Sequence, residues 1–151
     1  MNKPKSKGTA FESACVRFLR KRLDDDRIER RALHGSYDLG DIRGLFAHGY
    51  QGIAECKSYK KLGPADLAEW KEQTIAERGN SDADFALLVV HRKGVGEKRF
   101  GENHCYMQVR DLVKVMGGEF RCLAGESAME MWVQVTLEQA CQMIEGIYHE
   151  G

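Results

Sequence analysis

Three residues in the first half of the chain have the types and spacing of a site that hydrolyses phosphodiesters. Glu55 comes fourteen positions after Asp41, and Lys57 follows Glu55 by two. Because side chains alternate faces along a strand, Glu55 and Lys57 project from one side and Cys56 from the other. Carboxylate oxygens suit Mg²⁺, and a neighbouring ammonium can hold the attacking water or the phosphate. The pattern therefore predicts metal-dependent nuclease chemistry.

Glu12 is a further carboxylate candidate, near the start of a predicted helix. Each of these residues also has a simpler explanation. Glu12 lies three residues after Thr9, which is the spacing of a capping box. Asp41 could be an ordinary turn residue, and Glu55 with Lys57 could form a solvated ion pair. The order of all four residues along the chain nevertheless favours the nuclease interpretation.

In this order the residues resemble the PD-(D/E)xK nuclease superfamily and, within it, the archaeal-type and phage Holliday junction resolvases. The resemblance covers much of the chain. The segments that carry it are Lys7-Gly8-Thr9-Ala10-Phe11-Glu12, Asp41-Ile42, Ile53-Ala54-Glu55-Cys56-Lys57-Ser58 and Glu72-Gln73. Gly40 stands where that family usually has a proline before the aspartate.

The resemblance and the chemistry together assign roles at the site. Glu12, Asp41 and Glu55 are expected to hold one or two Mg²⁺ ions, for which Mn²⁺ would substitute, and Lys57 to orient the water. A soft thiolate suits magnesium poorly, so Cys56 is given only a backbone role, with its carbonyl oxygen as a metal ligand.

Secondary site residues follow from the resemblance more than from spacing. They are Ser36, in the loop before Asp41, and Gln73, where the family often places a glutamine on the next helix. Asp38 is the reserve candidate for the role of Asp41 if the hairpin register differs by three residues.

The expected activity is hydrolysis of DNA phosphodiester bonds at four-way junctions by paired symmetric nicks. Two equivalent sites would require a homodimer, joined through the edge of the strand at 85–91 or through the C-terminal helix. One rival is another phage or restriction-like endonuclease or exonuclease on the same fold. The other is a DNA-binding module that kept the fold without catalysis.

Length and composition fit one cytoplasmic domain. The 151 residues suffice for a single nuclease domain at 9–151, preceded by a flexible basic tail at 1–8. No stretch approaches the roughly 20 apolar residues of a membrane span. Five cysteines without a C-x-x-C pair argue against both a disulfide framework and a structural zinc site.

Charge is unevenly distributed although the net charge is zero. Residues 1–31 contain ten Lys or Arg against five Asp or Glu, whereas residues 119–151 contain one Arg against six Glu. This asymmetry predicts a basic face for phosphate contacts and a separate acidic face.

Periodicity predicts an α/β fold with a restriction-endonuclease-like core, in which a mixed β-sheet is flanked by helices and followed by a C-terminal helix. An apolar run at 85–91 is typical of a strand buried on both faces, so its connection from the strand of Glu55 should be a parallel crossover. Thr136 and Gln139 form a capping box for the last helix. The expected helices are 9–23, 64–79, 111–116 and one from 136, and the expected strands are 27–33, 38–46, 50–58, 104–109 and 131–135 besides 85–91.

Overall fold

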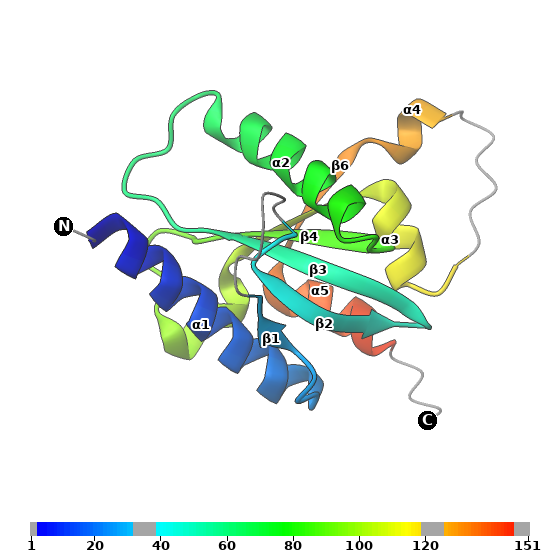
Figure 1. Ribbon diagram of the computed structural model, residues 1–151, viewed down its shortest axis with the longest axis horizontal. Helices are drawn as coiled ribbons and strands as arrows, with labels where there is room; N and C mark the ends of the chain where they lie inside the picture. The colour runs from blue at the N-terminus through cyan, green and yellow to red at the C-terminus, as the bar shows by residue number, and fades with distance from the viewer. Residues whose placement is uncertain (1–2, 32–38, 119–125, 147–151) are drawn as a thin grey trace.

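The computed structural model describes residues 3–31, 39–118 and 126–146, in which a six-stranded mixed sheet lies between helices (Figure 1). The strands are β1 (Glu29–Arg30), β2 (Ile42–Ala47), β3 (Tyr50–Lys57), β4 (Phe85–Val90), β5 (His104–Gln108) and β6 (Trp132–Thr136). The helices are α1 (Lys3–Leu23), α2 (Asp66–Asn80), α3 (Val109–Val115), α4 (Glu126–Met129) and α5 (Leu137–Glu145), with a 3₁₀ segment η1 (Glu97–Glu102). The α/β class, the mixed sheet and the C-terminal helix are as predicted.

The strands lie in the sheet in chain order, β1 to β6. β1, β2 and β3, which correspond to the strands predicted at 27–33, 38–46 and 50–58, form an antiparallel meander. β3 pairs with β4 in parallel, as the apolar run predicted. β4 lies between β3 and β5, and all six of its residues are buried. The strand at 85–91 therefore has no free edge, and the prediction that it could join two subunits as a sheet edge is wrong.

The two faces of the central sheet are covered by different helices. One face, which includes Ala54, Cys56 and Leu87, belongs to the hydrophobic core shared with α1 and α5. The alternate residues Glu55 and Lys57 project to the other face, on which α2 and α3 lie. The candidate catalytic pair on β3 is thus separated from the main apolar core by the sheet itself.

The start of α1 bears on the role of Glu12. The helix begins at Lys3, six residues before the start predicted at Thr9. Thr9 is therefore inside the helix and cannot be its N-cap, which excludes the capping-box explanation of Glu12. The boundary between a tail at 1–8 and a domain at 9–151 stays a prediction.

Other helix ends differ from the prediction by a few residues. α2 begins at Asp66, just after Pro64, and continues through Gly79, which was expected to end it. The capping box at the start of α5 is confirmed: the Thr136 hydroxyl accepts from the Gln139 backbone N–H at 3.1 Å, and the Gln139 side chain accepts from the Thr136 N–H at 2.9 Å. The short α4 and η1 segments were not predicted.

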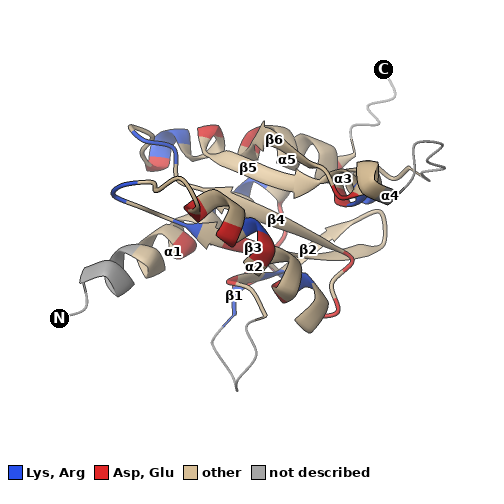
Figure 2. Cartoon of the chain, turned by 90° about the horizontal axis from the view of Figure 1, so that it is seen from above, with Lys and Arg blue, Asp and Glu red and all other residues tan. Residues whose placement is uncertain are grey.

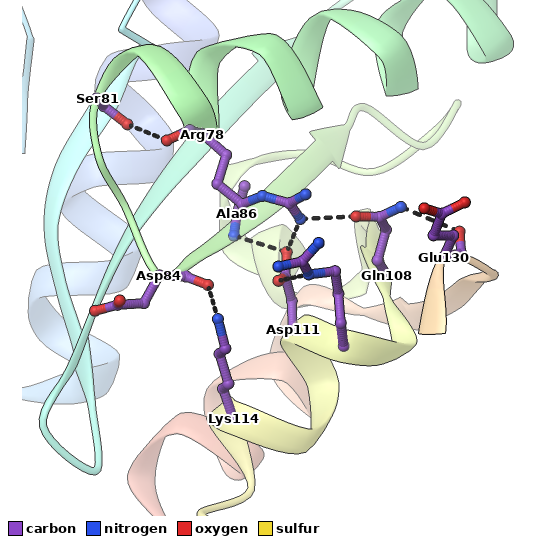
Figure 3. Close-up of polar contacts among 9 residues, drawn as sticks. Arg78, Ser81, Asp84, Ala86, Gln108, Asp111, Lys114 and Glu130 are labelled. Carbon is purple, nitrogen blue, oxygen red and sulfur yellow. Dashed lines mark hydrogen bonds and ion pairs between the residues drawn. The ribbon is translucent and has the colours of Figure 1, made fainter. Parts of the chain in front are cut away.

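A buried ion pair joins α2 to α3 on the α2 side of the sheet (Figure 3). Asp111 Oδ2 accepts from Arg78 Nη1 at 2.8 Å and from the backbone N–H of Ala86 at 3.1 Å. Arg78 Nη1 also donates to Gln108 Oε1 at 2.7 Å. Burial raises the pKa of Asp111, and the Arg78 charge opposes that shift. These contacts fix α2 against β4, β5 and α3 at the end of the helix farther from Lys57.

Two arginines of α1 form ion pairs with acidic residues of other elements. α1 packs against α5, and Arg22 forms ion pairs of 2.8 Å with both Glu138 and Glu145. Arg17 pairs with Glu97 of η1, also at 2.8 Å. The predicted division into a basic and an acidic face is therefore wrong for these residues. None of the described helices combines the length and the apolar composition needed to cross a membrane.

Candidate functional site

Asp41 lies at the bend just before β2 and is anchored to β3 and to the residue that follows β1. Its carbonyl accepts from the Arg31 N–H at 2.8 Å, its N–H donates to the Ala54 carbonyl at 3.2 Å, and its Oδ2 accepts from the Cys56 N–H at 2.8 Å. Burial, followed by the neighbouring Glu55 carboxyl, raises the pKa of Asp41 to about 8. These backbone hydrogen bonds thus hold the Asp41 carboxyl against β3, but they supply no positive charge to neutralise it.

Gly40 explains why Asp41 is not preceded by proline here. Gly40 has φ +91°, whereas a proline ring holds φ near −65°. This conformation belongs to the region that favours glycine, and it turns the chain immediately before Asp41. A proline at position 40 would therefore not fit the local backbone.

Glu12 reaches the site from α1. Its Oε2 accepts from Arg30 of β1, at 3.1 Å from Nη2 and 3.2 Å from Nε. Its carboxyl also lies within hydrogen-bonding reach of the Asp41 carboxyl. Burial and then the charge of Asp41 raise the pKa of Glu12, and Arg30 opposes that shift. The structure therefore brings together Glu12 and Asp41, which are far apart in the sequence.

Glu55 is almost completely buried on β3, with 2% of its surface exposed. Its carboxyl lies within hydrogen-bonding reach of both Asp41 and Glu77, and its Oε2 has no hydrogen-bond partner among the described residues. Burial raises the pKa of Glu55 to about 8; Glu77 adds to the shift, while Asp41 and Lys57 oppose it. A buried carboxylate oxygen without a donor is an unusual feature that calls for an explanation such as an absent ion.

Lys57 and Cys56 complete the part of the site that β3 supplies. Lys57 is half-buried, projects to the same face as Glu55, and lowers the pKa of both Glu55 and Asp41. The Cys56 side chain faces Cys15 of α1 in the core, as the alternation predicted. The N–H and C=O of a strand residue point to the same side of the strand, so the Cys56 carbonyl is directed toward Asp41. Its proposed use as a metal ligand stays a prediction.

Glu77 on α2 was not identified from the sequence. It is 1% exposed, and its carboxyl contacts that of Glu55. The sequence did contain a signal, because Glu77 is one helical turn after Gln73 and so lies on the same helix face. Gln73 itself is half-buried, and in the described parts of the chain no hydrogen bond joins it to these carboxylates. Ser36 and Asp38 lie outside the described residues.

The donor set fits a hard cation such as Mg²⁺ in kind. We call Glu12, Asp41, Glu55 and Glu77 the carboxyl chain, because each carboxyl lies within hydrogen-bonding reach of the next. The charge of Arg30 opposes the raised pKa of Glu12, and the charge of Lys57 opposes the raised pKa values of Asp41 and Glu55. No group of three or more His, Cys, Asp or Glu among the described residues is arranged to hold a metal ion as it stands. A cation beside Glu55 would satisfy its unpaired carboxylate oxygen.

Comparison of the chain with protein-family models, with curated proteins and with solved structures finds no match.

Proposed function

We propose that this protein is a Mg²⁺-dependent endodeoxyribonuclease with a restriction-endonuclease-like core. The observation that supports it best is the carboxyl chain beside Lys57, because its carboxyls on α1, β3, α2 and the bend before β2 are held together, and burial raises the pKa values of Glu12, Asp41 and Glu55. Such an arrangement is unfavourable for a folded protein unless protons or a cation balance it. A purely structural cluster would be expected to pair each carboxylate with a cation.

The roles of the residues follow from their positions. Glu12, Asp41 and Glu55 would hold the metal with the Cys56 carbonyl as a further oxygen ligand, and a bound Mg²⁺ would supply a hydroxide nucleophile and stabilise charge on phosphorus. Lys57, at the rim of the buried site, would bind the attacking water or a phosphate oxygen through its ammonium. Half-buried Gln73 and the residue Ser36 remain secondary proposals.

Isosteric variants test the chemistry. Asp41→Asn and Glu55→Gln keep shape but remove a charged ligand, so cleavage in Mg²⁺ should fall at least about 10²-fold, the scale of losing one transition-state stabiliser. Binding to DNA in EDTA should survive, because phosphate contacts dominate affinity. Glu69→Gln, an exposed carboxyl on α2, is the matched control and should cut normally. Cleavage by Glu55→Gln at the native rate would refute the proposal.

A variant of Glu12 distinguishes the proposed nuclease from a DNA-binding module without catalysis. Two observations favour the module: Glu12 is already paired with Arg30, and no ready-made metal site is found in the described residues. If Glu12 is a ligand, Glu12→Gln should lose activity while its melting temperature barely changes, because a partly exposed pair contributes about 0–1 kcal/mol. If the protein is a module, the native chain should bind DNA, show no Mg²⁺-dependent cutting, and gain no thermal stability from Mg²⁺.

The junction-resolving form of the proposal requires a homodimer, because one site can nick only one strand. The apolar side of α5 is buried in the core through Leu137, Ala140 and Ile144, so that side is not available to a second subunit.

Gel comparison of a labelled four-way junction with linear duplex tests the substrate. Mixed dimers of native and Glu55→Gln chains should nick one strand per junction. A monomer that prefers linear duplex would favour the restriction-like or exonuclease alternative. For either substrate, we assign the activity to the cytoplasm.

A further inference from the structure

Four aromatic side chains lie along the α2 side of the sheet, beyond Lys57. Tyr59 follows β3, Trp70 is on α2, Tyr106 is on β5 and Trp132 is on β6, and each is only half-buried. The rings of Tyr59 and Trp70 are 6.0 Å apart between centroids. Burial, with a contribution from Tyr59, raises the pKa of Tyr106, which places the two tyrosines near each other. With Lys71, these residues form what we call the aromatic surface.

Strand register shows that this surface is a face of the sheet and not part of the core. Tyr106 is opposite Gln134, and Gln108 is opposite Trp132, so Tyr106 and Trp132 are diagonal neighbours on one face. Gln108, two residues after Tyr106, bonds Arg78 of α2, which identifies that face as the α2 side. Cys105 and its alternates point the other way, into the core under α1 and α5.

α2 leaves this part of the sheet incompletely covered. The helix contacts β3 and β4, and over the outer strands the Lys71 ammonium lies 5.3 Å from the Tyr106 ring centroid and 5.6 Å from that of Trp132. A cation over two rings accounts for the position of Lys71. It does not account for why large aromatic side chains are held half-exposed at the outer strands of a sheet, where smaller polar residues would serve.

The lysines around the aromatic surface form no ion pair among the described residues, as is true of the other described lysines. Every ion pair among the described residues uses an arginine. Lys57, Lys60, Lys61 and Lys71, which are near the aromatic residues in sequence or in space, take part in none of them. Figure 2 shows Lys and Arg in the loop that follows β3, on the side where the N-terminal end of α1 lies. The exposed carboxylates Glu69 and Glu72 on α2 reduce this positive charge but do not pair with these lysines.

We propose that the aromatic surface binds a single-stranded segment of nucleic acid, with bases stacked on Tyr106 and Trp132 and on Tyr59 and Trp70, and with phosphates on the unpaired lysines. Bases stack on aromatic rings irrespective of sequence, and lysines follow the backbone. A duplex keeps its bases stacked inside and cannot offer them. This inference deepens the proposed nuclease function, since the surface begins two residues from Lys57 and would hold an unpaired strand of a branched substrate beside the carboxyl chain.

The test uses a fluorescein-labelled oligothymidylate and a duplex of equal length, with the full chain, in EDTA so that no cleavage occurs. Fluorescence anisotropy should show tighter binding of the single strand. Tyr106→Leu, Trp132→Leu and Lys71→Met should each weaken single-strand binding, the two ring deletions by roughly tenfold, which is typical of one stacked base. Duplex binding should change less than about twofold. Tyr106→Phe keeps the ring and should bind as the native chain does.

Phe46→Ala is the matched control. Phe46 is an exposed aromatic on β2 with the Arg27 guanidinium 4.3 Å from its ring centroid, so it has the same kind of cation contact away from this surface. Circular dichroism and melting temperature show whether each variant is folded; if Trp132→Leu is not, Tyr106→Leu against Tyr106→Phe decides. Native-like single-strand affinity in Tyr106→Leu, or equal loss for single strand and duplex, would overturn the inference.

The two proposals fail in different ways. If the native chain binds single strands through these rings but never cleaves DNA in Mg²⁺, the nuclease proposal is wrong and the aromatic surface stands. If it cleaves duplex DNA in Mg²⁺ and the ring variants bind single strands as the native chain does, the nuclease proposal stands and the aromatic surface has no part in binding.

Discussion

Asp41 shows how single residues create the unusual electrostatics of the candidate site. Its backbone bonds to Arg31 and Ala54, and its side chain accepts the N–H of Cys56, so it cannot turn away from β3. It is therefore held beside the Glu55 carboxyl, although burial already disfavours its charged form. Buried carboxyls with raised pKa values are typical of functional sites, where a bound ligand can supply the missing positive charge.

This arrangement predicts a pH dependence of stability in metal-free protein. The pKa of Asp41 rises from its ordinary value of 3.8 to about 8 on folding. A carboxyl with a raised folded-state pKa favours folding most below its unfolded-state value, and that stability is lost as pH rises through the folded-state value. Urea unfolding in EDTA should therefore show native stability falling, relative to Asp41→Asn, between about pH 4 and about pH 8. Parallel curves for the two proteins would contradict it.

Magnesium gives the companion measurement for the same residue. A cation that binds only the folded state stabilises it, and replaces the protons that the carboxyls would otherwise need. At pH 8 the melting temperature of the native chain should rise with Mg²⁺, and that of Asp41→Asn should rise less. An exposed-carboxyl variant, Glu69→Gln, should respond as the native chain does.

At the scale of elements, the contact of β3 with β4 determines where Glu55 lies. The two strands are parallel, and Gly52 is opposite Phe85 at the start of the pairing. A Cβ added at Gly52 would overlap the Phe85 ring. Gly52→Ala should therefore reduce the free energy of unfolding by about 1–3 kcal/mol, the usual effect of overpacking a core. Thermal unfolding measures it.

A control and a rescue make that prediction specific. Gly96→Ala, where no atom lies within 4 Å of an added Cβ, should change stability little. The double variant Gly52→Ala/Phe85→Leu should recover part of the loss by removing the ring. If Gly52→Ala is as stable as Gly96→Ala, the strands do not pack as described.

The Arg78–Asp111 pair is a buried polar contact that holds α2 in position. The buried residues of α2 are Thr74 and Glu77, neither of which is hydrophobic. Asp111 is 1% exposed, so Arg78→Met would leave its charge buried without its main partner. We expect a loss of about 3–5 kcal/mol in the free energy of unfolding. Arg110→Met, whose guanidinium is 4.0 Å from Asp111 and partly exposed, should cost less than about 1 kcal/mol. Similar losses in both variants would contradict this account.

At the scale of the whole molecule, the arrangement of charge indicates which cations remain for a polyanion. The arginines of α1 are used within the protein, as Arg22 is by Glu138 and Glu145. Lys60 and Lys61, which follow β3, form no ion pair among the described residues. The surface expected to contact phosphate therefore shifts from the N-terminal helix to the side of the sheet where β3 ends.

Salt dependence tests that shift. The slope of log affinity against log salt concentration reports the number of neutralised phosphates, at about 0.9 per contact for duplex DNA. Lys60→Gln/Lys61→Gln should reduce the slope by up to about two units. Arg17→Gln, which removes a cation already paired with Glu97, should leave it nearly unchanged. A larger effect from Arg17 than from the two lysines would place the DNA on α1 instead.

The sequence by itself determined the order and type of most elements, and the β3 part of the site. Alternation along a strand put Glu55 and Lys57 on one face, and the apolar run of β4 predicted a parallel, buried strand, because both depend only on local periodicity. The Thr136 capping box was readable for the same reason, since its two bonds join neighbours in sequence.

The features that only the tertiary structure showed depend on contacts between segments that are far apart in the sequence. Periodicity could not show that Glu77 of α2 meets Glu55, because nothing local fixes which turn of a helix faces a given strand residue. Nor could composition show that Arg22 of the basic α1 pairs with Glu138 and Glu145 of the acidic α5, since net charge along the chain does not say which segments pack together. Both contacts result from helix packing and strand order, which arise from burying apolar surface across the whole domain.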